Sequence, residues 1–276
     1  MIFETHTLTA PLDKFIESIF HFKHFSPDHS IERVVPTGHI FLLFELDGIP
    51  RNTFDNGTLK PNATFNKVWI SGMHKNYLSI SAPQDSEMFV IQFKPSGGHP
   101  FFHVPIDELN DRVVSAQEIL GDGILDLREK ILEKSTSNEK FALAENWLKS
   151  RFESSKTPNT ELLSTLDQLA NKPLSDHKTI VESYPKTQKH LIAQFKKYCG
   201  LTPKVLHRIF RFNEILQQIN EKKEINWSQI AHQCGYTDQS HFIKEFKEFS
   251  GFNPQKFISK KYNEQEPNFF PLDKQG

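Results

Sequence analysis

Cysteine, long apolar runs and net charge are all scarce in this sequence. Only two of its 276 residues are cysteines, Cys199 and Cys234, and the formal net charge is −1. Two cysteines cannot build a disulfide framework, so we expect reduced thiols in the helical core of a cytoplasmic protein. No segment is apolar for long enough to cross a bilayer, and the first residues lack the charged-then-apolar order of an export signal. The sequence therefore predicts a protein that is neither secreted nor bound to a membrane.

Residue patterns typical of catalysis, metal binding or nucleotide binding are also missing. Gly97 and Gly98 occur without the other glycines of a dinucleotide fingerprint and without the lysine of a phosphate-binding loop. No serine or cysteine nucleophile motif is present. His74, His99 and His103 lack the His-x-His and following glutamate that a metal-binding barrel requires. We expect no enzymatic activity, no cofactor and no metal site.

The near-zero net charge hides a strong separation of charge along the chain. Residues 172–262 contain 16 lysines and arginines against 8 aspartates and glutamates, so they carry +8, while the remainder carries −9. Concentrated positive charge on a small helical segment is typical of a surface that binds nucleic-acid phosphates. A basic, solvated face without a partner is the alternative.

The basic segment contains a repeat with a spacing of 51 residues. In each copy, two apolar residues four positions apart on one helical face are followed by a glycine and then a proline. The two sets are Leu191, Phe195, Gly200 and Pro203, and Phe242, Phe246, Gly251 and Pro254. Glycine suits the left-handed residue that ends a helix, and proline suits the first turn of the next helix. The repeat therefore predicts two helices that each end at a glycine and are each followed by another helix.

Candidate cap residues indicate that the repeat contains two helix-turn-helix units. Thr187 and Asp238 precede the two predicted helices as N-caps. Upstream of the second helix, Ser228 is expected to cap a short helix that ends at the turn of Gly235 and Tyr236. Two helices joined by a tight, glycine-containing turn form a helix-turn-helix, and an ordinary helical repeat is the alternative.

A longer stretch around the second unit matches a known pattern. The run from Trp227 to Phe257, WSQIAHQCGYTDQSHFIKEFKEFSGFNPQKF, resembles the second helix-turn-helix of the AraC family of bacterial transcription regulators. Residues 179–219 resemble the more variable first unit and the long linker helix that joins the two. The resemblance implies that two recognition helices, Gln188–Tyr198 and Gln239–Phe249, enter successive major-groove segments of double-stranded DNA. It predicts a protein that regulates transcription.

The resemblance also indicates which residues contact DNA. The residues expected to contact DNA, which are the base-reading positions and their outward-facing neighbours, are Gln188, Lys189, Ile192, Lys196, Gln239, Ser240, His241, Ile243, Lys244 and Lys247. In the second helix, polar side chains offer donors and acceptors to base edges, and Ile243 can pack on a thymine methyl group. The first helix has Ala193 where the family often has arginine, and Tyr184 and Pro185 replace the usual glycine of its turn. We therefore expect an asymmetric reader whose specificity is weighted to the second unit.

The N-terminal part is predicted to contain strands first and helices second, which makes the whole chain α+β. Short apolar or alternating runs indicate strands at 31–36, 39–46, 67–71, 76–82 and 88–93, the first two paired through a tight turn at Thr37 and Gly38. A polar, asparagine-rich loop is expected at 50–66. A small β-barrel or a rolled antiparallel sheet closes so many short strands economically. Helices are predicted at 116–120, 124–133, 138–152 and 160–169.

The stretch from Val34 to Leu148 resembles a companion domain of unknown function that accompanies AraC-type domains. Such companions are often cupin-like barrels, so the resemblance implies that this domain binds a small-molecule effector or forms a homodimer. The aromatic residues considered for an effector site are Phe41, Phe44, Trp69, Tyr77 and Phe89, and a filled core is the alternative for them.

Three segments follow from these patterns. Residues 1–155 form a sensing or dimerisation domain, 156–262 form an all-α DNA-binding domain, and 263–276 form a tail in which Phe269 and Phe270 either dock or fray. Two other functions stay open. The weak first recognition helix allows a protein-interaction adaptor with degenerate DNA binding. A small-molecule enzyme fused to a DNA-binding domain occurs among DNA-repair relatives of the family, but their reactive N-terminal cysteines have no counterpart here.

Overall fold

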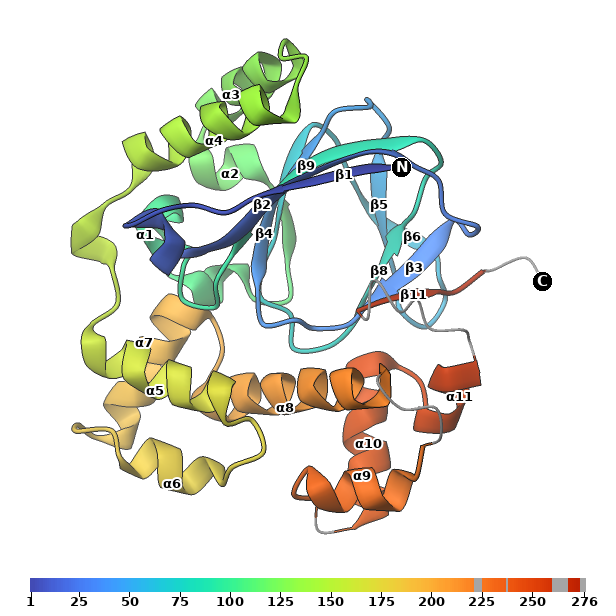
Figure 1. Ribbon diagram of the computed structural model, residues 1–276, viewed down its shortest axis with the longest axis vertical. Coiled ribbons are helices and arrows are strands. Elements are labelled where there is room, and N and C mark those ends of the chain that lie inside the picture. Colours follow the sequence, from blue (N-terminus) through green and yellow to red (C-terminus); the bar gives the residue numbers. More distant parts are fainter. Residues whose placement is uncertain (221–224, 237, 260–267, 274–276) are drawn as a thin grey trace.

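Most of the strands lie before residue 116, and most of the helices follow (Figure 1). The computed structural model describes residues 1–220, 225–236, 238–259 and 268–273. The predicted α+β class is confirmed, and the described strands form two antiparallel sheets rather than a closed barrel. No helix in these ranges is both long and apolar enough to cross a bilayer.

The two sheets face each other and differ in size. The large sheet has six strands, which in spatial order are β1 (Ile2–His6), β2 (Ile16–Phe25), β9 (Ser86–Phe93), β4 (Ile40–Glu45), β7 (Val68–Ser71) and β10 (Val113–Ser115). The small sheet has five strands, which in spatial order are β11 (Phe269–Pro271), β3 (Ile31–Val34), β8 (Leu78–Ser81), β5 (Arg51–Phe54) and β6 (Pro61–Phe65).

Helices first cover the large sheet and then build an all-α part. The α-helices are α1 (His99–Phe102), α2 (Ala116–Leu120), α3 (Gly123–Leu132), α4 (Ser137–Arg151), α5 (Thr160–Asn171), α6 (His177–Glu182), α7 (Gln188–Cys199), α8 (Pro203–Asn220), α9 (Trp227–Gln233), α10 (Gln239–Ser250) and α11 (Pro254–Ser259). Short 3-10 helices are η1 (Leu12–Lys14), η2 (Ile106–Leu109) and η3 (Ser154–Lys156). The helices expected from the repeat, α7 and α10, and the long linker helix α8 are therefore present.

Strand β4 lies in the middle of the large sheet because both of its faces are apolar. Ile40, Leu42 and Phe44 are fully buried and belong to the core that packs against the helices. Phe41 and Leu43 point to the opposite face, towards the small sheet. Alternation along an extended strand separates the two sets, and burial on both faces explains the near-continuous apolar run.

The predicted pairing of residues 31–36 with 39–46 is wrong. Strand β3 pairs with β8 in the small sheet, whereas β4 pairs with β7 and β9 in the large sheet. In the large sheet, both apolar faces of β4 are covered, one by the helices and the other by the small sheet. The chain therefore crosses between the sheets at Gly38 instead of forming a hairpin. The loop expected at 50–66 is also wrong, because it contains the paired strands β5 and β6.

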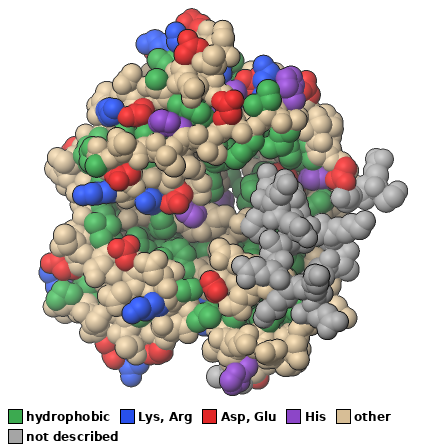
Figure 2. Space-filling view, viewed as in Figure 1, with side chains coloured by type: hydrophobic (Ala, Val, Ile, Leu, Met, Phe, Trp, Pro, Cys, Tyr) green, Lys and Arg blue, Asp and Glu red, His purple; other side chains and the backbone are tan. Residues whose placement is uncertain are grey.

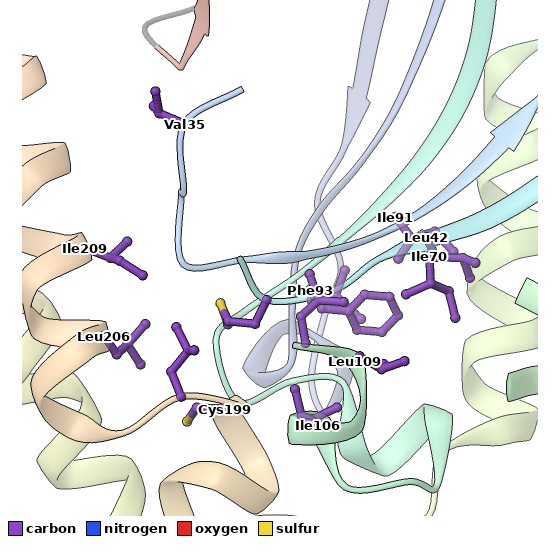
Figure 3. Close-up of a cluster of buried hydrophobic side chains, with 14 of the residues drawn as sticks. Val35, Leu42, Ile70, Ile91, Phe93, Ile106, Leu109, Cys199, Leu206 and Ile209 are labelled. Atoms are coloured by element: carbon purple, nitrogen blue, oxygen red, sulfur yellow. The ribbon is translucent and has the colours of Figure 1, made fainter. Parts of the chain in front are cut away.

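The hydrophobic core continues from the large sheet into the helical part. Figure 3 shows Ile106 and Leu109 of η2 between the sheet residues and Cys199, Leu206 and Ile209 of the helical part. All of these side chains are buried in one cluster. The two cysteines are free and buried, as predicted for core thiols.

The C-terminal tail docks at Phe269 and Phe270 rather than fraying there. Strand β11 pairs antiparallel with β3, and Phe270 is buried against Phe257 of α11 with a ring separation of 4.3 Å. Asp273 accepts hydrogen bonds from the amides of Ser30 and Ile31 at 3.0 and 2.8 Å. Docking buries the ring of Phe270 and part of that of Phe269, which a free tail could not do.

Candidate DNA interface and effector cavity

The two predicted recognition helices begin and end as the repeat indicates. The side chain of Thr187 accepts a hydrogen bond from the His190 amide at 3.2 Å, and that of Asp238 accepts one from the His241 amide at 2.8 Å. Gly200 and Gly251 end the helices with φ angles of 78° and 71°. Only glycine adopts this left-handed region without strain.

The predicted DNA-contacting side chains lie on the open faces of these helices. On α7, Gln188, Lys189 and Lys196 are exposed, whereas Ile192 is half-buried. On α10, all six predicted residues are exposed: Gln239, Ser240, His241, Ile243, Lys244 and Lys247. The second helix therefore presents the larger polar surface, and Ile243 is an apolar residue left in water.

The turns that precede α7 and α10 are built differently. In the second unit, Gly235 has a φ of 74°, and Asn226, not Ser228, caps α9 by accepting the Gln229 amide at 3.1 Å. In the first unit, Tyr184 is buried and its hydroxyl lies 2.9 Å from Nδ1 of His190. Tyr184 does not have a positive φ, so this turn needs no glycine.

Glu245 of α10 is buried directly beneath the exposed residues. It accepts hydrogen bonds from Arg208 Nε and Arg211 Nη2 of α8 and from Tyr236 Oη, each at 2.7 Å. Burial alone would raise the pKa of Glu245, but the phenol and the two guanidinium groups lower it below its ordinary value. A buried charge held from three sides fixes the orientation of α10 relative to α8.

A side chain of the N-terminal part contacts the C-terminal end of each recognition helix. Asn110, which follows η2, donates from Nδ2 to the carbonyl oxygen of Gly200. Arg33 of β3 donates from Nη1 to the carbonyl oxygen of Ser250 at 3.1 Å. A Cβ atom at Gly200 would collide with Asn110, and one at Gly251 would collide with Arg33. The two glycines of the repeat are therefore equivalent docking points as well as helix ends.

A cavity of about 320 Å³ lies between the two sheets. In Figure 2 it is visible as a hollow containing hydrophobic side chains, at the place where Figure 1 shows the two sheets facing each other. Its aromatic lining consists of Phe20, Phe22, Phe25, Phe41, Phe65, Trp69 and Phe269. The volume is in the range of small-molecule sites, which begins at about 300 Å³.

Four of the five aromatic residues considered for an effector site divide between the two faces of the large sheet. Phe41 and Trp69 line the cavity. Phe44 and Phe89 lie in the filled core on the other face. Tyr77 lies beneath Arg33, whose guanidinium carbon is 4.1 Å from the ring centroid. Alternation of side chains along the strands, together with the crossing of the chain between sheets, decides this division.

The cavity borders both docking points. Glu32 and Val34 of β3 line it, so Arg33 between them points the opposite way, towards α10. Gly72 and His74 also line it. There, the Gly72 amide donates to the Arg112 carbonyl at 3.0 Å and the Asp111 amide donates to the Met73 carbonyl at 2.9 Å, beside Asn110.

The three histidines considered as metal ligands have separate environments. Nε2 of His74 lies 3.1 Å from the Ser71 hydroxyl, and Nδ1 of His99 lies 2.8 Å from the Val104 carbonyl. His103 contacts the carbonyl oxygen of Arg151 at 3.1 Å. Within the described ranges, no group of three or more His, Cys, Asp or Glu side chains is arranged to hold a metal ion.

Sequence reasoning missed Glu245, Arg33 and Asn110. Glu245 had a local signal, because it lies on the same helical face as Phe242 and Phe249, where a carboxylate requires a partner. Arg33 and Asn110 had none, since their contacts join residues far apart in the sequence.

Two family models match the chain. One, described as a helix-turn-helix domain, covers residues 184–260. The C-terminal part of this chain is an AraC-type helix-turn-helix domain. The other model, a domain of unknown function (DUF6597), covers residues 5–115. No curated protein matches the sequence.

Several structures of ToxT from Vibrio cholerae are similar to the chain. An apo variant has 12% identity and a TM-score of 0.46, covering 87% of this chain and 97% of ToxT. Another ToxT structure has 13% identity and a TM-score of 0.44, covering 93% and 97%. A third, described as bound to an unsaturated fatty acid, has 12% identity and a TM-score of 0.44, covering 87% and 94%. Similarity at this level does not define a function.

The exposed residues of α7 and α10 lie within this AraC-type domain. A domain of this type binds DNA in a transcription regulator. Because α8 has 18 residues, it is a spacer of about 27 Å between the two units.

Proposed function

We propose that this protein regulates transcription by reading the major groove with α7 and α10, with most of the sequence specificity in α10. The supporting observation is the exposed polar surface of α10, which the buried Glu245 anchors to the linker helix. Such a helix presents its side chains to DNA in one fixed orientation, which reduces the entropy lost on binding.

The residues of α10 have distinct roles in this proposal. Gln239, Ser240 and Lys244 contact base edges, and Ile243 packs on a thymine methyl group. His241 and Lys247 contact phosphates. On α7, Gln188 and Lys189 are the main contacts and Lys196 adds a phosphate contact. Ile192 contributes least, since its side chain is half-buried.

Fluorescence anisotropy with DNA from upstream of the gene for this protein tests the proposal. Across a salt series, the logarithm of the binding constant should fall linearly with the logarithm of salt concentration, because several phosphate contacts release counterions. If no DNA is bound even at low salt, the regulator proposal fails and the adaptor alternative takes its place.

We further propose that the cavity receives a small-molecule effector in the cytoplasm. The supporting observation is its position between β3, which carries Arg33, and the Gly72–His74 segment, which lies beside Asn110. A ligand that moves either wall changes the position of a recognition helix, so occupancy can alter DNA affinity. A homodimer stays a prediction, and sedimentation at several protein concentrations tests it.

A further inference from the structure

The cavity between the sheets offers no free charge to a ligand. Within the described part of the chain, its charged lining residues are Arg51 and Glu32. Nη2 of Arg51 lies 2.6 Å from Asp47 Oδ2 and 2.9 Å from Glu45 Oε2. Burial raises the pKa of Glu45 to about 7, so Asp47 is the partner that stays fully charged at pH 7. A guanidinium held by both groups has little attraction left for another carboxylate. Glu32 pairs with Nε2 of His29 at 3.3 Å and offers an anion no attraction, so the walls are unfavourable for a carboxylate.

Most polar groups of the lining also have partners within the protein. The Ser71 hydroxyl pairs with His74 at 3.1 Å, and Oε1 of Gln92 accepts a hydrogen bond from Ser18 at 3.2 Å. Burial lowers the pKa of both His39 and His74, so both imidazoles are neutral at pH 7. Nδ1 of His39 has no hydrogen-bond partner among the described residues. A neutral imidazole can share a hydrogen bond with a hydroxyl or carbonyl group but gives no charge to an acid.

The remaining lining is apolar and rich in rings. Phe41, Leu43, Trp69 and Val90 of the large sheet face Leu78 and Ile80 of the small sheet across the cavity. Flat rings pack well between aromatic side chains, with ring centroids 4.5–7 Å apart as a general range. Releasing water from such walls favours an apolar occupant.

We propose that the cavity binds a neutral, largely apolar ring compound with at most one hydrogen-bonding group, and that it discriminates against carboxylates. This inference rests on the proposed effector site and names its ligand class. The discrimination arises because an acid would bury its charge beside Glu32 and Asp47, while His29 and Arg51 already pair with these carboxylates and leave no free cation to balance it.

Isothermal titration calorimetry of the full chain at pH 7 with two matched probes tests the ligand class. The probes are 4-acetylbiphenyl and biphenyl-4-carboxylate, which have similar shape and differ in charge. We expect the ketone to bind and the carboxylate to bind at least about tenfold more weakly, a factor that corresponds to about 1.4 kcal/mol. Equal or tighter binding of the carboxylate, or no binding of the ketone, overturns the inference.

Cavity-filling variants test whether the ketone binds in the cavity between the sheets. Leu43→Trp fills the cavity and should abolish ketone binding, whereas Leu132→Trp, on the outer surface of α3, should leave it unchanged. If Leu43→Trp fails to fold by circular dichroism, Ile80→Trp fills the same space from the small sheet. Ketone binding that survives a folded cavity-filling variant overturns the inference.

DNA anisotropy on the same wild-type preparation separates the ligand proposal from the regulator proposal. DNA binding without ketone binding refutes only the ligand class, whereas absence of DNA binding refutes the regulator.

Discussion

Lys244 is the residue on which the asymmetry between the two recognition helices depends most. It is exposed on α10 two turns from the cap, and its neighbour Glu245 is fixed from below. Lys189 is also exposed, but it lies one turn earlier on α7, at the position equivalent to Ser240, and the residue equivalent to Lys244 is Ala193.

Lys244→Ala should weaken specific DNA binding by about 1–3 kcal/mol if the lysine contacts a base. Lys189→Ala should cost less, and Ala193→Arg should leave affinity intact or raise it. Anisotropy titrations with specific and scrambled DNA measure all three. A loss from Ala193→Arg as large as that from Lys244→Ala would contradict the asymmetry.

His207 makes the stability of the helical part depend on pH. It is buried on α8, its ring stacks on His177 of α6 at 5.5 Å, and burial lowers its pKa to about 4. Because the folded pKa lies below the unfolded value of about 6.5, the neutral ring contributes stability above pH 6.5 that is lost as pH falls towards 4.

Urea unfolding at pH 7 and pH 5 checks this. Between these values the wild type should lose about 2 kcal/mol more than His207→Phe, from 1.36 kcal/mol per pKa unit. The difference between the two proteins cancels the contributions of titrating groups that do not interact with His207. Equal losses in both would show that His207 titrates normally in the folded state.

At the scale of elements, ion pairs join α10 to the linker helix, and both recognition helices are joined to the N-terminal part at their C-terminal ends. Glu245 joins α10 to α8, while Arg33 and Asn110 join the ends of α10 and α7 to the N-terminal part. The N-caps Thr187 and Asp238 lie at the other ends of the two helices and take no part in these contacts.

Glu245→Ala should destabilise the protein by about 3–5 kcal/mol, because Arg208 and Arg211 would lose a shared, buried partner. Glu248→Ala is the matched control. Its side chain also pairs with Arg208, at 2.7 Å, but it is 45% exposed, so its removal should cost about 1 kcal/mol or less. Chemical denaturation of both variants gives the two values, and similar costs would argue against a structural role for Glu245.

Arg33→Ala should loosen α10 from the small sheet. The guanidinium is buried, donates to Ser250 and lies 4.1 and 4.4 Å from the ring centroids of Tyr77 and Phe252, so its loss should cost about 2–4 kcal/mol. Hydrogen exchange should increase at the C-terminal end of α10 but not at that of α7, and Asn110→Ala should give the reverse pattern. Uniform exchange changes in both variants would contradict independent docking points.

At the scale of the whole molecule, the two parts share one core. Buried residues from Leu12 to Phe270 belong to a single hydrophobic cluster that includes the large sheet, η2 and the helices α7 and α8. Figure 3 shows the segment of this cluster that crosses from sheet to helices. The tail strand β11 adds a second connection, since it pairs with β3 while Phe270 packs on α11.

Scanning calorimetry should therefore show one cooperative unfolding transition for the full chain. Separate domains with a small, polar interface would unfold independently, but a continuous apolar core couples the two parts. Two resolved transitions, with the first matching loss of DNA binding, would show that the shared core contributes little to coupling.

The sequence by itself determined the helices of the DNA-binding domain. Caps at Thr187 and Asp238, glycine ends and a helical period of apolar residues are local signals, and each acts within a few residues of where it occurs. The base-contacting residues were assigned from the resemblance to the AraC family, and their contacts with DNA stay predictions.

Tertiary structure alone decided the arrangement of strands, the cavity and the docking of both recognition helices. Pairing of β11 with β3, and the contacts of Arg33 with Ser250 and of Asn110 with Gly200, join residues 90 or more positions apart. Such contacts leave no periodic pattern, because each partner is chosen by where the packed core places it rather than by its neighbours in sequence. The glycines of the repeat show both levels: local backbone geometry requires them at the helix ends, and the folded chain uses the space above them for Asn110 and Arg33.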